Sequence, residues 1–154
     1  MTNLEPLSQT QSQKVNKVLV WIFLLLGLVG FFDATYLTAK HYLGGPIVCP
    51  IFGGCEDVLN SPYSTIGFIP VAMLGMFYYG FLLILTVAYL DTGKLDFLKW
   101  AARLTAAGLI ASAWFMFAQF ILINALCFYC VVSAIISLAL FVFGQIFLRV
   151  IARQ

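Results

Sequence analysis

The sequence predicts an all-α integral membrane protein, a bundle of four transmembrane helices. Two observations predict this class: hydrophobic residues make up 63% of the 154 residues, and charged residues only 9%. A soluble chain of this size exposes too much surface for so few charges to cover, so the surplus apolar surface must face lipid. The net charge of +2 gives no indication of nucleic-acid binding.

Three apolar runs account for the four helices, because a helix needs about 20 apolar residues to cross the hydrocarbon. Runs 18–39 and 68–90 each supply one span, the first interrupted only by Asp33. Run 100–148 is about twice one span long, so it must turn once, and Asn124 is its strongly turn-prone residue. We expect helices at about 100–123 and 126–148. An intramembrane acid such as Asp33 is a functional candidate, although hydrogen bonding to a neighbouring helix explains it equally well.

The basic residues predict how the helices are oriented. Four spans put both termini and the 91–99 connection on one side of the membrane. Seven of the eight basic residues fall there: Lys14, Lys17, Lys94, Lys99, Arg103, Arg149 and Arg153. Only Lys40 falls on the other side. The positive-inside rule therefore predicts cytoplasmic termini. Residues 1–17 are expected to form a polar tail, and residues 18–150 the four-helix transmembrane domain. The long connection 40–67 would face a periplasm or an equivalent oxidising space.

All four cysteines fall at this outward face, in two pairs. Cys49 and Cys55 lie in the long connection, and Cys127 and Cys130 lie at the start of the fourth helix. The helix dipole stabilises a thiolate at such a position, and the i, i+3 spacing puts both sulfurs on one face. Two glycines just before Cys55 let the first pair close its own disulfide. The pattern indicates two redox-active pairs.

Three alternatives stay open at this point. The cysteines are small apolar residues that membrane helices accept readily. Both pairs are also compatible with inert structural disulfides in a membrane scaffold. A zinc site is the third alternative, but the first pair has the spacing C-x5-C, and His41 is the one histidine in the chain. We therefore expect no metal.

Several of these residues occur together in a known family. The segment from Cys49 to Cys55 is followed by Ser61-Pro62-Tyr63, Ile69-Pro70 and Gly75, and then by Cys127-x-x-Cys130. This order resembles the bacterial members of the vitamin K epoxide reductase family, as does the segment 33–38. The resemblance covers residues from about 18 to 150. The other known four-helix thiol–quinone enzyme, the bacterial disulfide-bond-formation membrane protein, carries its C-x-x-C first.

The resemblance implies a bundle around a quinone of the ubiquinone, menaquinone or vitamin K type. It implies that Cys130 faces the quinone ring, beside Ser61 from a surface loop in which residues 56–60 form a short flat helix. It also implies that Cys49 and Cys55 carry electrons inward from a thioredoxin-fold partner, Cys49 being attacked by the partner and Cys55 attacking Cys127. Tyr63 and Phe115 are further candidates for stacking against the ring. Since the chain stops at Gln154, we expect a separate, DsbA-like partner protein.

The predicted activity is that of an oxidoreductase acting on sulfur groups with a quinone as acceptor, in a bacterial inner membrane. This activity would drive disulfide-bond formation outside the cytoplasm. An alternative is reduction of vitamin K epoxide or quinone to recycle the cofactor. Animal enzymes of the family carry an asparagine and a tyrosine where this chain has Val71 and Ala134. Both residues are apolar, which favours simple quinone reduction.

Overall fold

The computed structural model describes residues 16–45, 47–49, 51 and 53–153. The polar tail expected at the N-terminus lies outside these residues as far as residue 15. Four long helices dominate the structure: α1 (Lys17–Leu43), α3 (Val71–Thr92), α4 (Leu95–Phe117) and α5 (Phe128–Ala152). A π-helical segment, η2 (Ala118–Ile123), continues α4. All four are long and apolar enough to cross a membrane, which confirms the predicted fold class.

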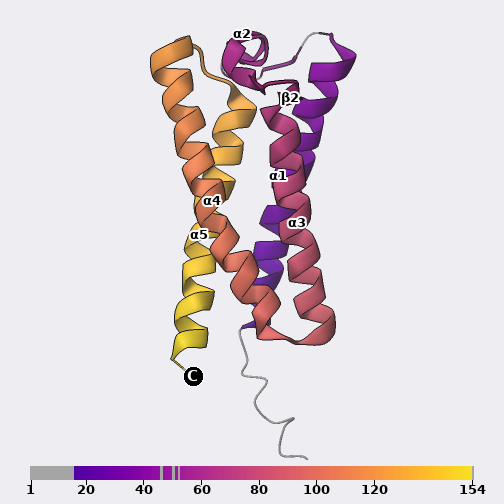
Figure 1. Ribbon diagram of the computed structural model, residues 1–154, viewed down its shortest axis with the longest axis vertical. Helices are drawn as coiled ribbons and strands as arrows, with labels where there is room; N and C mark the ends of the chain where they lie inside the picture. The colour runs from indigo at the N-terminus through magenta and orange to yellow at the C-terminus, as the bar shows by residue number, and fades with distance from the viewer. Residues whose placement is uncertain (1–15, 46, 50, 52, 154) are drawn as a thin grey trace, which may run out of the picture.

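The four long helices lie side by side along the length of the molecule (Figure 1). α1 packs against α3 and α5, and α4 packs against the same two helices. Successive helices run in opposite directions, so short connections suffice between α3 and α4 and between η2 and α5. The centre is filled by large apolar side chains that are fully buried: Val20, Phe23, Leu82, Leu98, Leu140 and Phe147. The rings of Phe23 and Phe147 lie 5.5 Å apart and join α1 to α5.

The segment between α1 and α3 covers one end of the bundle (Figure 1). It contains α2 (Cys55–Leu59), a 3₁₀ turn η1 (Pro62–Ser64), and the antiparallel strands β1 (Thr65–Ile66) and β2 (Ile69–Pro70). The short helix expected at 56–60 is thus present within one residue. The second long helix begins at Val71 and not at Phe68, because Gly67 turns a hairpin there with φ +65°.

Two connections differ in length from the expectation. The one expected over 91–99 shrinks to Gly93 and Lys94, because α4 already begins at Leu95. Lys99 and Asp96 form an ion pair of 3.2 Å on its first turn, so polar residues extend the helix beyond its apolar run. The corner expected at Asn124 is confirmed: this residue adopts φ +55°, the one positive φ outside glycine among the described residues.

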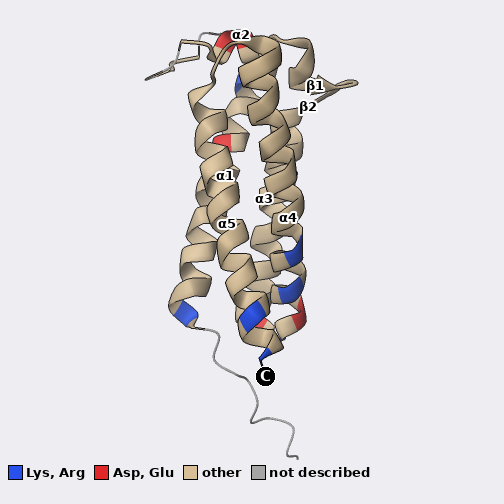
Figure 2. Cartoon of the chain, turned by 90° about the vertical axis from the view of Figure 1, so that its left-hand side faces the viewer, with Lys and Arg blue, Asp and Glu red and all other residues tan. Residues whose placement is uncertain are grey.

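Most of the basic residues lie at one end of the bundle. Figure 2 shows Lys and Arg gathered at the end opposite α2. The basic residues of that end belong to the first turn of α1, the start of α4 and the last turns of α5. Lys40 lies in the last turn of α1, at the other end of that helix. The covered end, with α2, is therefore the end that carries few cations.

Candidate redox site

All four cysteines lie in one cluster at the covered end. Cys55 and Cys127 are buried in its centre, with exposed fractions of 1% and 0%, and share it with Leu37 and Val58. Cys49 and Cys130 pack against this centre. A loop residue and a helix terminus 72 positions apart in the sequence are thus brought into one apolar environment. The structure places both predicted pairs together.

The two pairs are in different states. Cys49 and Cys55 form a disulfide, with their Cα atoms 6.3 Å apart, whereas Cys127 and Cys130 are free thiols. Thiol–disulfide exchange needs one thiolate and one disulfide within reach of each other. The cluster holds one of each. Among the described residues, no group of three or more His, Cys, Asp and Glu side chains has the arrangement of a metal site.

Gly54 allows the first pair to approach the second. A Cβ atom on this residue would lie 2.9 Å from the Cβ of Ala125 and 3.0 Å from the backbone nitrogen of Leu126. The backbone just before Cys55 therefore packs directly on the backbone just before Cys127. Only glycine leaves room for this contact.

Tyr129 ties the disulfide segment to α5. This residue lies inside the C-x-x-C motif, and its hydroxyl donates a hydrogen bond of 3.1 Å to the carbonyl of Val48, next to Cys49. Its ring lies 5.0 Å from the ring of Tyr36 on α1. One side chain between the two cysteines of the second pair thus positions the first pair.

Cys127 is the N-cap residue of α5, outside its membrane-spanning segment. Its backbone N–H donates a hydrogen bond of 2.9 Å to Oε1 of Gln119 in η2. A hydrogen bond from the Cys130 thiol lowers the pKa of the Cys127 thiol to about 7, while burial and the charge of Asp33 act in the opposite direction. Cys127 is therefore the thiol of the pair that ionises near neutral pH.

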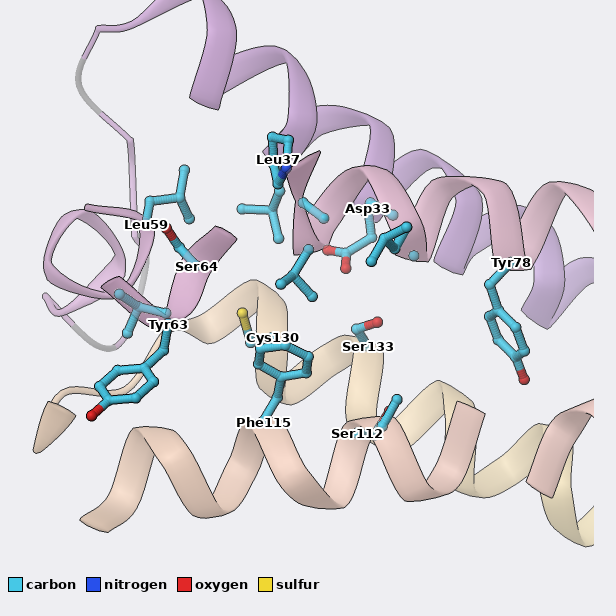
Figure 3. A pocket seen from close by; sticks show the side chains of 18 of the residues that line it. Asp33, Leu37, Leu59, Tyr63, Ser64, Tyr78, Ser112, Phe115, Cys130 and Ser133 are labelled. Carbon is cyan, nitrogen blue, oxygen red and sulfur yellow. The ribbon is translucent and has the colours of Figure 1, made fainter. Parts of the chain in front are cut away.

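A cavity of about 410 Å³ opens beside the second pair. All four long helices contribute to its wall, and α2 with η1 closes its end. The four residues predicted to contact a quinone line it together: Ser61, Tyr63, Phe115 and Cys130. Figure 3 shows the Cys130 sulfur next to the Phe115 ring. The volume is that of a site for a small ring-shaped ligand.

The predicted contact residues differ in what they offer to a ligand. Ser61 donates its hydroxyl proton to the carbonyl of Val58 at 2.8 Å, so towards a ligand it acts as an acceptor. Tyr63 is 45% exposed and lies at the rim. Phe115 and Cys130 face the interior, where Figure 3 shows them with the Asp33 carboxyl group.

The cavity wall contains polar atoms that the protein leaves without a partner. Oδ2 of Asp33, the hydroxyl of Tyr78 and Nε2 of Gln119 are buried and have no hydrogen-bond partner among the described residues. All three residues line the cavity. The hydroxyl of neighbouring Tyr79, in contrast, meets those of Ser133 and Ser137 at 2.9 Å and 3.0 Å. Unpartnered buried polar groups in an apolar, aromatic cavity fit a ring that carries oxygen atoms, as a quinone does.

Neither Gln119 nor Tyr129 is among the site residues predicted from the sequence, which indicated Gly54 only as a residue that lets the first pair close, not as the contact with residues 125 and 126. Gln119 carried a signal: it is an uncharged polar residue in the run 100–148, eight residues before Cys127. Tyr129 and Gly54 carried none beyond their position next to a cysteine. Their contacts are with Val48 and Ala125, which lie far away in the sequence.

This fold and this site define a class: a helical membrane protein with a cluster of redox-capable cysteines beside an apolar cavity. The family model described as the vitamin K epoxide reductase family matches residues 21–144. The chain belongs to this family. It is similar to the thiol-disulfide oxidoreductase LTO1 of Arabidopsis thaliana, being 38% identical over 118 residues. That match covers 71% of this chain and 31% of the plant protein, so the chain spans about a third of its relative's length.

The cysteine cluster supplies a disulfide and two thiols, which are the groups that thiol–disulfide exchange requires.

Proposed function

We propose that the protein passes two electrons from an extracytoplasmic thioredoxin-fold partner through Cys49 and Cys55 to Cys127 and Cys130, and on to a quinone. Disulfide bonds would thereby form in the partner and its substrates. One observation carries the proposal: Cys55 and Cys127 are buried in one cluster, and Cys130 of the second pair lies on the cavity. This arrangement supports a route for electrons from the first pair through the second pair to the cavity.

The exchange steps use the four cysteines in order. The partner's dithiol first reduces the Cys49–Cys55 disulfide. The Cys55 thiolate then attacks the Cys127 sulfur of a Cys127–Cys130 disulfide, and Cys130 leaves as a thiolate. Attack of Cys49 on Cys55 restores the first disulfide and releases Cys127. The lowered pKa of Cys127 supports this order, because a thiol of low pKa leaves faster. The state in the structure, with the first pair oxidised and the second reduced, is the product of these steps.

The cavity residues complete the reaction. Re-forming the Cys127–Cys130 disulfide releases two electrons and two protons, and a bound quinone supplies the acceptor for both. Phe115 offers a ring face for stacking beside Cys130. Asp33 presents an unpartnered carboxyl oxygen in the same wall, at which a released proton can be held. The apolar lining keeps water away from the reacting thiols.

The proposed orientation puts this chemistry outside the cytoplasm. Cations at the end opposite α2 support cytoplasmic termini, because basic residues are retained on that side. The covered end would then face a periplasm or an equivalent space, as in a bacterial inner membrane. Disulfides persist there, in keeping with the Cys49–Cys55 bond.

Simple quinone reduction is the preferred form of the activity. Val71, which stands where animal members of the family carry an asparagine, lines the cavity with an apolar side chain. Such a side chain offers no hydrogen bond to an epoxide oxygen. The epoxide reaction is tested directly by supplying vitamin K epoxide in place of the quinone.

The decisive experiment follows quinone absorbance. Purified protein in lipid nanodiscs is mixed with a reduced thioredoxin-fold protein and a short-chain ubiquinone or menadione. We expect Cys130→Ser to abolish quinone reduction, and Cys49→Ser to block reoxidation of the partner. Full turnover in all four single serine variants would instead show that the cysteines are structural. Labelling of intact cells with an impermeant thiol reagent tests the proposed side.

A further inference from the structure

Gln119 has two ends that face different parts of the site. It is 1% exposed, and its Oε1 accepts the backbone N–H of Cys127 at 2.9 Å. Since an N–H can only be accepted by an oxygen here, this bond fixes which end of the amide carries the nitrogen. Nε2 must therefore point the other way. It lines the cavity and lies beside the Cys130 sulfur.

The two protons on Nε2 have no hydrogen-bond partner among the described residues. Leaving such a donor unsatisfied in a buried site is unfavourable, because it has given up its hydrogen bonds to water. Gln119 also lies in the π-helical segment η2, and single π-helical turns occur frequently at functional sites. A buried amide whose oxygen is bonded to Cys127 and whose nitrogen lies beside the Cys130 sulfur is placed to donate to a ligand there.

We propose that Gln119 is a quinone-contact residue, which donates a hydrogen bond from Nε2 to a ring carbonyl oxygen next to Cys130. This inference rests on the proposed function, because it takes the occupant of the cavity to be a quinone. The same amide would contact both the second cysteine pair and the quinone. Its oxygen holds the backbone of Cys127, and its nitrogen orients the ring in front of Cys130. Hydrogen bonds to a carbonyl oxygen favour reduction, because they stabilise the charge that the oxygen gains.

The test measures binding separately from turnover. In a Cys130→Ala background, which blocks turnover, menadione binding is followed by tryptophan fluorescence, and its carbonyl stretching bands by infrared spectroscopy. We expect Gln119→Met to weaken menadione binding about tenfold. We also expect it to shift one carbonyl band to the higher frequency of an oxygen without a hydrogen bond. The matched control is Gln145→Met on α5, away from the cavity, which should change neither quantity.

A second variant separates ligand contact from support of Cys127. Gln119→Glu keeps an oxygen for the Cys127 N–H, and its other oxygen becomes a donor only when protonated. Menadione binding by Gln119→Glu should therefore strengthen as the pH falls, whereas Gln119→Met stays weak at every pH. An unchanged carbonyl band in Gln119→Met, or unchanged affinity in both variants, would overturn the proposal.

These outcomes are independent of the proposed electron transfer through the cysteine pairs. A wild-type protein that binds menadione through Gln119 but never reduces it would refute the proposed function and leave this contact standing. A wild-type protein that reduces menadione, with Gln119→Met binding it unchanged, would refute the contact alone.

Discussion

Gly54 and Ala125 meet where the disulfide segment packs on the corner before α5, and a Cβ atom on Gly54 would approach that of Ala125 to 2.9 Å. The contact joins the residue before Cys55 to the chain that leads into Cys127. It is a backbone-to-backbone contact, so neither partner can yield by rotating a side chain. The close approach of the two cysteine pairs thus depends on the absence of a side chain at Gly54.

Gly54→Ala should separate the two pairs. Overpacking of this kind costs about 1–3 kcal/mol, and we expect electron transfer from the first pair to the second to slow about tenfold. The measurement is the rate at which the Cys55–Cys127 mixed disulfide forms, with release of the Cys130 thiolate, in a Cys49→Ala variant whose Cys127–Cys130 disulfide has been formed beforehand. Gly53→Ala is the matched control, because a Cβ atom at that position meets no atom within 4 Å. Equal rates in both alanine variants would show that this packing does not govern exchange.

Tyr129→Phe should impair the same step for a different reason. It removes the hydrogen bond to the Val48 carbonyl, worth about 1 kcal/mol, and keeps the ring. We expect partner oxidation to slow about fivefold. Quinone reduction by protein whose second pair is already reduced should stay unchanged. Tyr89→Phe, near the opposite end of α3, serves as the control. A loss of quinone reduction alone would contradict the role of Tyr129 in positioning the first pair.

The ionisation of Cys127 should give the reaction a characteristic pH dependence. Its pKa is lowered to about 7, so the thiolate is present above that pH and lost below it. With the first pair oxidised, the rate at which menadione oxidises the second pair in a single turnover should rise through about pH 7 and then level off.

The cause of the low pKa is tested by two variants at one position. Cys130→Ser retains a donor to Cys127 and should keep its pKa low, whereas Cys130→Ala should raise the pKa towards that of an ordinary thiol. Ultraviolet absorbance of the Cys127 thiolate, followed against pH, measures this pKa in each variant. A low pKa in Cys130→Ala would mean that the hydrogen bond is not the cause.

Gly30→Ala should destabilise the bundle next to the cavity. A Cβ atom on Gly30 would lie 2.5 Å from the Tyr79 ring, and that ring cannot easily move, because its hydroxyl meets those of Ser133 and Ser137. We expect the free energy of unfolding to fall by about 1–3 kcal/mol. Thermal unfolding in detergent measures the change. Gly75→Ala is the control, since its Cβ atom would make an ordinary contact of 3.6 Å with Ala34. Equal stability of the two variants would contradict the prediction.

The sequence was sufficient to predict the four helices and the corner between the last two, because each depends on local chemistry. A span is determined by the length of an apolar run, and Asn124 tolerates the left-handed conformation that the corner requires. The same runs could not predict that α4 begins at Leu95, because a helix continues past the hydrocarbon wherever polar residues such as Asp96 and Lys99 pair along it.

The cysteine pairs were visible in the sequence, but the parts that align them were not. The contacts of Gly54, Tyr129 and Gln119 are set by packing between different elements. Pattern reasoning detects a periodic face or a spacing, and none of these residues belongs to either. Gln119 could have been selected as an uncharged polar residue inside a span, which is an uncommon place for an amide unless it has a partner.

The corner between η2 and α5 consists of residues 124–127 alone. A connection this short leaves Cys127 and Cys130 at a depth set by two helices that extend through the whole bundle. In the proposed electron transfer, Cys127 and Cys130 would therefore stay in place. Any movement needed to meet first a partner and then Cys127 would be made by Cys49 and Cys55, which are carried by the much longer segment between α1 and α3.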